Sequence, residues 1–179
     1  MIHLPAAYNL ARWLLRDAQQ AEDAVQEAYL RALRFFDDLH GEDARPWLMG
    51  IVRNACYDSM RERRRLGDQV EFDEMQDSES ACLATTAWPE GGVDPAVLWD
   101  KRVLGKRVNA AIEALAPAFR EVIVLRELEE MSYEDIARVA GIPLGTVMSR
   151  LSRARALLRE ALRAEHGTTI AARRRDANA

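Results

Sequence analysis

The sequence predicts an all-α protein, built as two small helical domains joined by a flexible acidic linker. Aromatic residues make up only 7% of the chain, whereas Ala, Leu and Arg, which favour helices, are abundant. Apolar residues recur at three- and four-residue steps on both sides of residues 66–95, the spacing of amphipathic helices. Within residues 66–95 that spacing stops and Asp, Ser, Gly and Pro collect instead, which is typical of a linker with little structure of its own.

The predicted domain boundaries follow from this pattern. Residues 1–65 form the first domain, 66–95 the linker, 96–165 the second domain and 166–179 a disordered tail, because chain ends fray unless they are tied down. Charge divides in the same way: residues 66–95 carry eight acidic residues and no basic ones, whereas residues 96–179 carry fifteen basic and eleven acidic residues. The net charge of −4 therefore hides a strongly segregated distribution.

Three helices are expected in the first domain. The first covers about residues 5–16, with Pro5 tolerated in its first turn. The second covers about residues 20–36 and the third about residues 43–65. Each has an apolar stripe at helical spacing: Val25, Ala28, Tyr29, Ala32 and Phe36 in the second helix, and Trp47, Leu48, Ile51, Val52 and Ala55 in the third.

In the second domain we expect a helix over residues 95–115, broken by Pro117, and a short helix over residues 118–128. Ser132 then fits an N-terminal cap, with Asp135 in the first turn of the next helix. Gly141 can adopt the left-handed conformation that ends a helix, and Pro143 suits the start of another. Two helices joined by a short Gly-containing turn form the helix-turn-helix pattern.

The last helix, which contains "GTVMSRLSRAR" (residues 145–155), has two contrasting faces. One is an apolar stripe for packing, formed by Val147, Leu151, Ala154, Leu158, Ala161 and Leu162. The opposite face mixes small residues with hydroxyls and arginines: Thr146, Ser149, Ser152, Arg153, Ala156 and Arg163, with Arg150 at its border. Such a face fits duplex DNA, because arginine matches phosphate oxygens and the guanine edge. Taken alone, the face also fits a solvated helix whose arginines provide solubility.

Other function classes find little support in the sequence. The chain contains neither an apolar run long enough to span a bilayer nor a secretory signal pattern. Cys56 and Cys82 lie far from any His, which argues against a four-ligand metal site and a disulfide framework. No phosphate-binding loop or nucleophile arrangement appears. We therefore expect a cytoplasmic, non-enzymatic protein with no catalytic residues, metal or cofactor.

Residues 21–36 and 44–65 resemble region two of bacterial sigma factors, and residues 115–162 resemble region four. The closest similarity is to the extracytoplasmic-function group of the sigma-70 family, which retains only these two regions. The resemblance implies a transcription initiation factor that binds core RNA polymerase, reads minus-ten and minus-thirty-five promoter elements and aids promoter melting. The alternative is an autonomous helix-turn-helix transcriptional regulator, which would leave the first domain without a role.

The resemblance also assigns residues to three surfaces. The polymerase-binding set is Asp23, Gln26 and Glu27, which lie off the buried stripe of the second helix. The set for minus-ten DNA is Arg53, Asn54, Tyr57 and Arg61. The set for minus-thirty-five DNA is Thr146, Met148, Ser149, Arg150, Ser152 and Arg153.

Two departures from the family pattern stand out. Met148 occupies a place where many relatives have Lys or Arg, which should weaken phosphate contact or shift base preference. Many relatives also have several more residues before the first helix, so either that helix is shorter in this chain or the chain starts late. The resemblance alone implies one further partner, an anti-sigma factor.

Overall fold

The computed structural model describes residues 3–36, 43–66 and 95–176, with side chains for residues 3–36, 43–66 and 103–163. Its helices are α1 (Leu4–Leu15), α2 (Ala18–Arg34), α3 (Ala44–Arg65), α4 (Pro95–Glu113), α5 (Pro117–Ile123), α6 (Tyr133–Ala140) and α7 (Leu144–Asp176). A π-helical segment, η3 (Val124–Leu128), continues directly from α5. The described residues contain no β-strand, and the predicted all-α fold class is confirmed.

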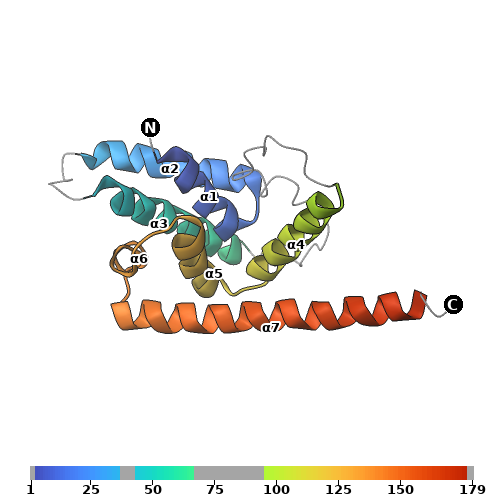
Figure 1. Ribbon diagram of the computed structural model, residues 1–179. Helices are drawn as coiled ribbons and strands as arrows, with labels where there is room; N and C mark the ends of the chain where they lie inside the picture. Colours follow the sequence, from blue (N-terminus) through green and yellow to red (C-terminus); the bar gives the residue numbers. More distant parts are fainter. Residues whose placement is uncertain (1–2, 37–42, 67–94, 177–179) are drawn as a thin grey trace.

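Helices α1 to α3 pack together as a bundle, the N-terminal module (residues 3–66) (Figure 1). Two aspartates cap its helices: Asp17 accepts a hydrogen bond from Gln20 N at 2.8 Å, and Asp43 accepts one from Arg45 N at 3.0 Å. Each cap satisfies a backbone N–H group at a helix start. The predicted stripes largely point inward, since Val25, Ala28, Ala32, Leu48, Val52 and Ala55 are all buried.

Helices α4 to α7, together with η3, form the C-terminal module (residues 95–176). Ser132 Oγ accepts a hydrogen bond from Asp135 N at 3.0 Å and caps α6. Gly141 ends that helix in the left-handed conformation with φ +64°. Val147, Leu151 and Ala154 are buried on one side of α7. The predicted helix-turn-helix geometry is therefore confirmed, cap and turn included.

Buried residues of the two modules form one hydrophobic cluster. Helix α3 packs on α6, and α1 packs on α5. Figure 1 shows α5 and α6 between the three-helix bundle and the long helix α7. Gly50 of α3 lies at the crossing with α6, where an added Cβ atom would lie 3.9 Å from the carbonyl oxygen of Val139 and 4.0 Å from its Cα. The small residue lets the two helices approach closely.

Several predicted boundaries need correction. Pro117 starts α5 instead of preceding it, since proline fits the first helical turn. The last five residues of the helix predicted over 118–128 form η3, a π-helix. Phe36 is 62% exposed, because α2 ends at Arg34 and its stripe does not continue to residue 36.

The structure describes most of the predicted tail but almost none of the predicted linker. Helix α7 continues to Asp176, whereas the sequence suggests a disordered tail from residue 166; that tail stays a prediction. No proline interrupts residues 144–176, and proline is the strongest helix breaker. The predicted linker falls almost wholly on residues 67–94, which lie outside the described residues.

Candidate functional site

The predicted polymerase-binding residues lie on the exposed face of α2. Asp23, Gln26 and Glu27 are all exposed, because the buried side of the helix is taken by small and apolar residues such as Ala24 and Val25. Asp23 and Glu27 line a groove of about 270 Å³ between α2 and α3. The structure thus brings two of the three predicted residues together at a hollow, open surface.

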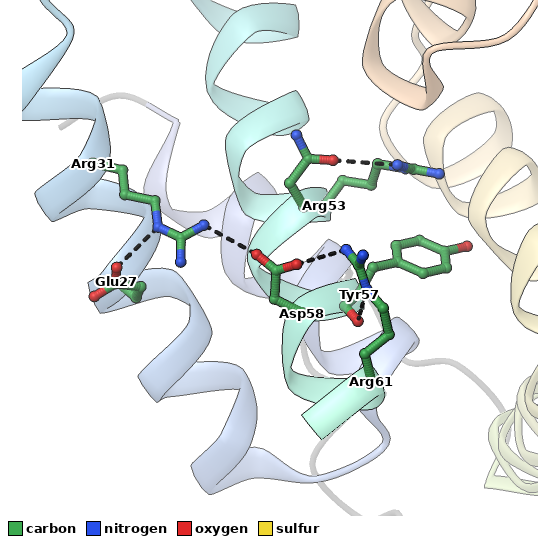
Figure 2. Close-up of polar contacts among 7 residues, drawn as sticks. Glu27, Arg31, Arg53, Tyr57, Asp58 and Arg61 are labelled. Carbon is green, nitrogen blue, oxygen red and sulfur yellow. Dashed lines mark hydrogen bonds and ion pairs between the residues drawn. The ribbon is translucent and has the colours of Figure 1, made fainter. Parts of the chain in front are cut away.

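Arg31 and Asp58 organise this groove, and neither was singled out from the sequence. Arg31 donates from Nε to Glu27 Oε1 at 2.9 Å and from Nη1 to Asp58 Oδ2 at 3.2 Å (Figure 2). Hydrogen bonding to Glu27 and then to Asp58 raises the pKa of Arg31. Arg61 continues the chain of ion pairs, since its Nη2 lies 2.6 Å from Asp58 Oδ1. Charged contacts therefore run from the α2 face to the predicted minus-ten face of α3.

The four residues predicted to contact minus-ten DNA separate into two pairs. Asn54 and Arg61 are exposed on α3. Arg53 and Tyr57 are instead partly buried and contact the C-terminal module. Arg53 Nε donates to Glu121 Oε1 at 2.5 Å, and the Tyr57 hydroxyl donates to Glu121 Oε2 at 3.2 Å.

Arg53 and Tyr57 also contact one another. The guanidinium of Arg53 lies over the Tyr57 ring, 4.3 Å from its centroid, in a cation–π arrangement. Burial, followed by the nearby negative charge of Glu121, raises the pKa of Tyr57 to about 12. Tyr57 is therefore a neutral hydrogen-bond donor at physiological pH. The same two side chains offer a cation and an aromatic surface, which are the groups that hold an unstacked base and its phosphate.

The predicted minus-thirty-five residues occupy one side of α7 near its start. Met148, Ser149, Ser152 and Arg153 are exposed, while Thr146 and Arg150 are half-buried. Ser149 Oγ donates to Thr146 O at 3.0 Å. The face combines hydroxyls and an exposed arginine on a rigid helix whose other side is anchored in the core, as a major-groove reader requires.

Arg155, from the same arginine-rich stretch, has a different environment. It donates from Nε and Nη2 to Glu127 Oε1, at 3.1 and 2.7 Å. Hydrogen bonding to Glu127, and then to Tyr133, raises the pKa of Arg155. Its charge is thus directed at η3, so the arginines of residues 150–155 do not form a single DNA-facing group.

A second carboxylate also joins the modules. Glu129, directly after η3, is buried and accepts from Asn9 Nδ2 at 2.6 Å and from Arg45 Nη2 at 3.1 Å. Arg45 Nη2 also donates to the backbone carbonyl of Glu129 at 2.8 Å. Together with Glu121, this residue fixes the C-terminal module to α1 and α3.

Arg120 forms a third cross-module contact. Its buried guanidinium donates to four backbone carbonyls: Trp13 O at 3.0 Å, Ile112 O at 3.3 Å, Glu113 O at 2.5 Å and Leu115 O at 2.8 Å. These carbonyls lie at or just beyond the C-terminal ends of α1 and α4, where helical carbonyls often lack an intrahelical partner. Ile112 O also accepts from Leu115 N at 3.1 Å. Burial, followed by the charge of Arg16, lowers the pKa of Arg120 to about 10, so it stays charged at neutral pH.

None of these cross-module contacts was predicted from the sequence, although the sequence contains one signal of them. Arg120 and Glu121 stand inside an otherwise apolar run, Phe119 followed by Val122 to Leu125. A charged pair within such a run indicates burial with specific partners.

Three further observations concern metal binding, thiol reactivity and membrane spanning. Among the described residues, no group of three or more His, Cys, Asp or Glu side chains is placed to hold a metal ion. Cys56 is fully buried, and burial raises the pKa of its thiol to about 12, which keeps it protonated and unreactive. In the part of the chain with described coordinates, no helix combines the length and hydropathy needed to span a bilayer.

A helical module with an exposed acidic groove, combined with a helix-turn-helix module, defines a DNA-binding transcription protein. The family description Sigma-70 region 2 matches residues 1–66, and Sigma-70, region 4 matches residues 106–158. The ECF RNA polymerase sigma-E factor of Escherichia coli is 36% identical over 137 residues, covering 74% of this chain and 69% of that protein. The chain belongs to the sigma-70 family, in the group of ECF RNA polymerase sigma factors.

Two more comparisons extend this assignment. The ECF RNA polymerase sigma factor SigE of Mycolicibacterium smegmatis is 32% identical over 169 residues, covering 94% of this chain but 62% of that protein. This chain thus spans less than two thirds of that relative. The sigma factor RpoE, solved in complex with the anti-sigma factor NepR from Bartonella quintana, aligns with a TM-score of 0.66 and 31% identity, covering 90% of this chain and 92% of that one. That alignment is long enough to include both modules.

Proposed function

We propose that this protein is a transcription initiation factor that binds core RNA polymerase and directs it to specific promoters. The observation that carries the proposal is the pairing of region two and region four in one chain, with a DNA-compatible face on α7. The protein acts in the cytoplasm, where polymerase and promoter DNA meet. It is not an enzyme, since promoter opening uses binding free energy to offset the cost of separating the strands.

The N-terminal module has two roles in this proposal. Asp23, Gln26 and Glu27 contact core polymerase, and the groove beside α3 accepts a side chain of the partner. An acidic groove favours a basic partner side chain, because opposite charges attract across an interface. Arg53, Asn54, Tyr57 and Arg61 contact minus-ten DNA as it opens, supplying cations for the backbone and an aromatic ring for stacking.

The C-terminal module reads the minus-thirty-five element as duplex. Arg153 and Ser152 face the major groove, while Thr146, Ser149 and Arg150 contact phosphate or base edges. Met148 adds an apolar contact where a cation would add salt-dependent phosphate attraction. Because both modules act through one polymerase, each can bind its DNA element weakly on its own.

An anti-sigma factor is proposed as a further partner. The proposal rests on the similarity to a sigma factor whose structure contains an anti-sigma factor. Such a partner would hold the protein inactive until a signal arrives.

Run-off transcription with purified core polymerase tests the proposed function. The protein should give discrete transcripts from a subset of genomic promoters, and their start sites should share two upstream elements. The autonomous regulator predicts something different: tight, specific binding to an operator by the isolated protein and no transcripts with core polymerase. That second result would overturn the proposal.

A further inference from the structure

Met148 is an exposed apolar side chain on the otherwise polar face near the start of α7. It is 49% exposed, and Ser149 and Ser152 beside it are exposed as well. Val147 and Leu151 supply the apolar contacts of this part of the helix, since both belong to the hydrophobic cluster of buried residues. Met148 is therefore not used for packing the core and is available to a partner.

Met148 and Arg153 border the reading face on opposite sides. At 100° per residue they lie about 140° apart around the helix axis and about 7.5 Å apart along it. Ser152 and Ser149 fall between them, about 40° and 100° from Met148. Arg153 is exposed and carries a planar fork of charged donors. The face is thus asymmetric, with a cation at one edge and a thioether at the other.

The arginines nearest the Met148 edge are engaged within the protein. Arg155 and Arg159 both lie within about 20° of Met148 around the axis, two and three turns further along. The Arg155 guanidinium donates to Glu127 Oε1 at 2.7 and 3.1 Å, and Arg159 Nε donates to Arg155 O at 3.2 Å. Because phosphate oxygens are held by cations and other hydrogen-bond donors, this edge is better suited to an apolar contact than to a phosphate.

Gly145 indicates that another surface approaches the helix beside Met148. It is exposed and lies in the first turn of α7, about 60° from Met148 around the axis. A Cβ atom added to it would meet no atom of the protein within 4 Å. Packing within the chain therefore does not require a glycine, although alanine is the better helix former. A missing side chain does allow close approach by a partner's surface.

The chemistry of the major groove selects the group that a methionine can contact there. The base edges present hydrogen-bond donors and acceptors, and the one apolar group among them is the C5-methyl group of thymine. Methionine is unbranched and polarisable, so its side chain adapts to an irregular apolar surface. An exposed methionine on a helix that reads the major groove therefore matches a thymine.

We propose that Met148 determines specificity within the minus-thirty-five contact by packing against the C5-methyl group of a thymine. The proposal rests on the proposed function, because that function places this face of α7 in the major groove. The 7.5 Å between Met148 and Arg153 corresponds to about two base-pair steps of about 3.4 Å. The thymine should therefore lie within about three base pairs of the base that Arg153 contacts.

Removal of the methyl group alone tests the proposal. Run-off transcription maps a promoter, and each thymine near minus thirty-five, on either strand, is then replaced singly by deoxyuridine, which lacks only that group. Competition fluorescence anisotropy measures binding of each duplex by the complex of the protein with core polymerase. One replacement should weaken binding about fourfold, the ratio that corresponds to burial of one methyl group. If no replacement changes the affinity, the proposal is overturned.

The Met148→Ala variant shows whether the effect of the methyl group depends on this side chain. In its complex, the duplex with deoxyuridine at the sensitive position should bind within 1.5-fold of the thymine duplex, as expected when one partner of a pairwise contact is already absent. Leu157→Ala truncates another exposed apolar residue of α7, about 180° from Met148 around the axis, and should keep the fourfold difference. Equal sensitivity in Met148→Ala would refute the contact.

Two further variants separate a DNA contact from a structural role. Met148→Lys should lose the discrimination for the methyl group and steepen the slope of log affinity against log salt by about one. Gly145→Ala should weaken promoter binding at least twofold while the urea midpoint stays equal or rises. An unchanged salt slope, or unchanged binding by Gly145→Ala, would place this edge away from the duplex and contradict the proposal.

Failure of the proposed function has a different signature. In that case the unmodified protein and all four variants would form no promoter-specific complex with core polymerase. Failure of the Met148 proposal alone leaves promoter-specific binding and run-off transcription intact, and removes only the dependence on the thymine methyl group.

Discussion

Arg53 of α3 and Glu121 of α5 form an ion pair in which the carboxylate is fully buried and the guanidinium is about one-fifth exposed. The pair spans 68 positions of sequence and joins the two modules. It also places a predicted promoter-contacting arginine beside a region-four carboxylate instead of in solvent. The stability of the whole chain should therefore depend on a residue that the family pattern assigns to DNA.

Replacing Arg53 tests that dependence. Arg53→Ala leaves the buried Glu121 carboxylate without its cation and should destabilise the protein by about 3 kcal/mol, the scale at which breaking a buried pair acts. Equilibrium urea unfolding measures the change. Arg61→Ala is the matched control, since its side chain is 70% exposed and exposed pairs contribute about 0–1 kcal/mol. Equal, small losses for both variants would show that the cross-module pair does not stabilise the fold.

Arg120 should matter for stability in the same way. Arg120→Met introduces an apolar side chain and removes the guanidinium that donates to four backbone carbonyls. Ile112 O keeps a hydrogen bond from Leu115 N, and each buried acceptor that is left unpaired costs about 1–3 kcal/mol. We expect a loss of at least 3 kcal/mol in the free energy of unfolding. Arg159→Met, at an exposed position of α7, serves as the control and should change stability by less than about 0.5 kcal/mol. If Arg120→Met lowered the free energy of unfolding by as little as Arg159→Met, water would readily replace the guanidinium.

Local signals explain which parts of the fold the sequence could predict. Ser132, Asp135 and Gly141 act within a few residues of their own positions, so a cap and a left-handed turn can be recognised without tertiary information. The buried stripe of α7 follows from helical periodicity for the same reason.

The missed features depend on contacts between distant segments. Arg31 meets Asp58 from 27 positions away, and Glu121 meets Arg53 from 68 positions away. The four predicted minus-ten residues share a helix, yet packing against α5 covers Arg53 and Tyr57 and leaves Asn54 and Arg61 exposed. Sequence spacing fixes position along a helix but not what the neighbouring module covers.

The α2 face should control binding to core polymerase. The double variant Asp23→Ala and Glu27→Ala removes two of the three acids that line the groove, and Asp58 is the third. It should weaken affinity at least tenfold, because charged contacts that are desolvated at an interface cost about 2–5 kcal/mol when one partner is truncated. Fluorescence anisotropy with labelled protein and core enzyme gives the Kd. Glu160→Ala, an exposed acid on α7, should leave the Kd unchanged. Equal affinity for the groove variant would place the docking surface elsewhere.

The exposed arginine of α7 should control promoter choice. Arg153→Ala should reduce promoter-specific run-off transcription at least fivefold, because a base-edge contact of arginine contributes about 1–3 kcal/mol of discrimination. Affinity for core polymerase should stay within twofold of the unmodified protein. Arg159→Ala, six positions further along the same helix, should transcribe normally. Equal loss of polymerase binding and transcription in Arg153→Ala would show that the reading face is misplaced.

Footprinting of the polymerase complex on a mapped promoter tests the division of labour between the modules most directly. With core enzyme present, we expect protection of a duplex patch near minus thirty-five together with permanganate-reactive, unpaired thymines near minus ten. The Arg153→Ala variant should lose the protection near minus thirty-five before it loses the unpaired thymines near minus ten. A single short protected patch that forms without polymerase, and no unpaired thymines in its presence, would contradict the account.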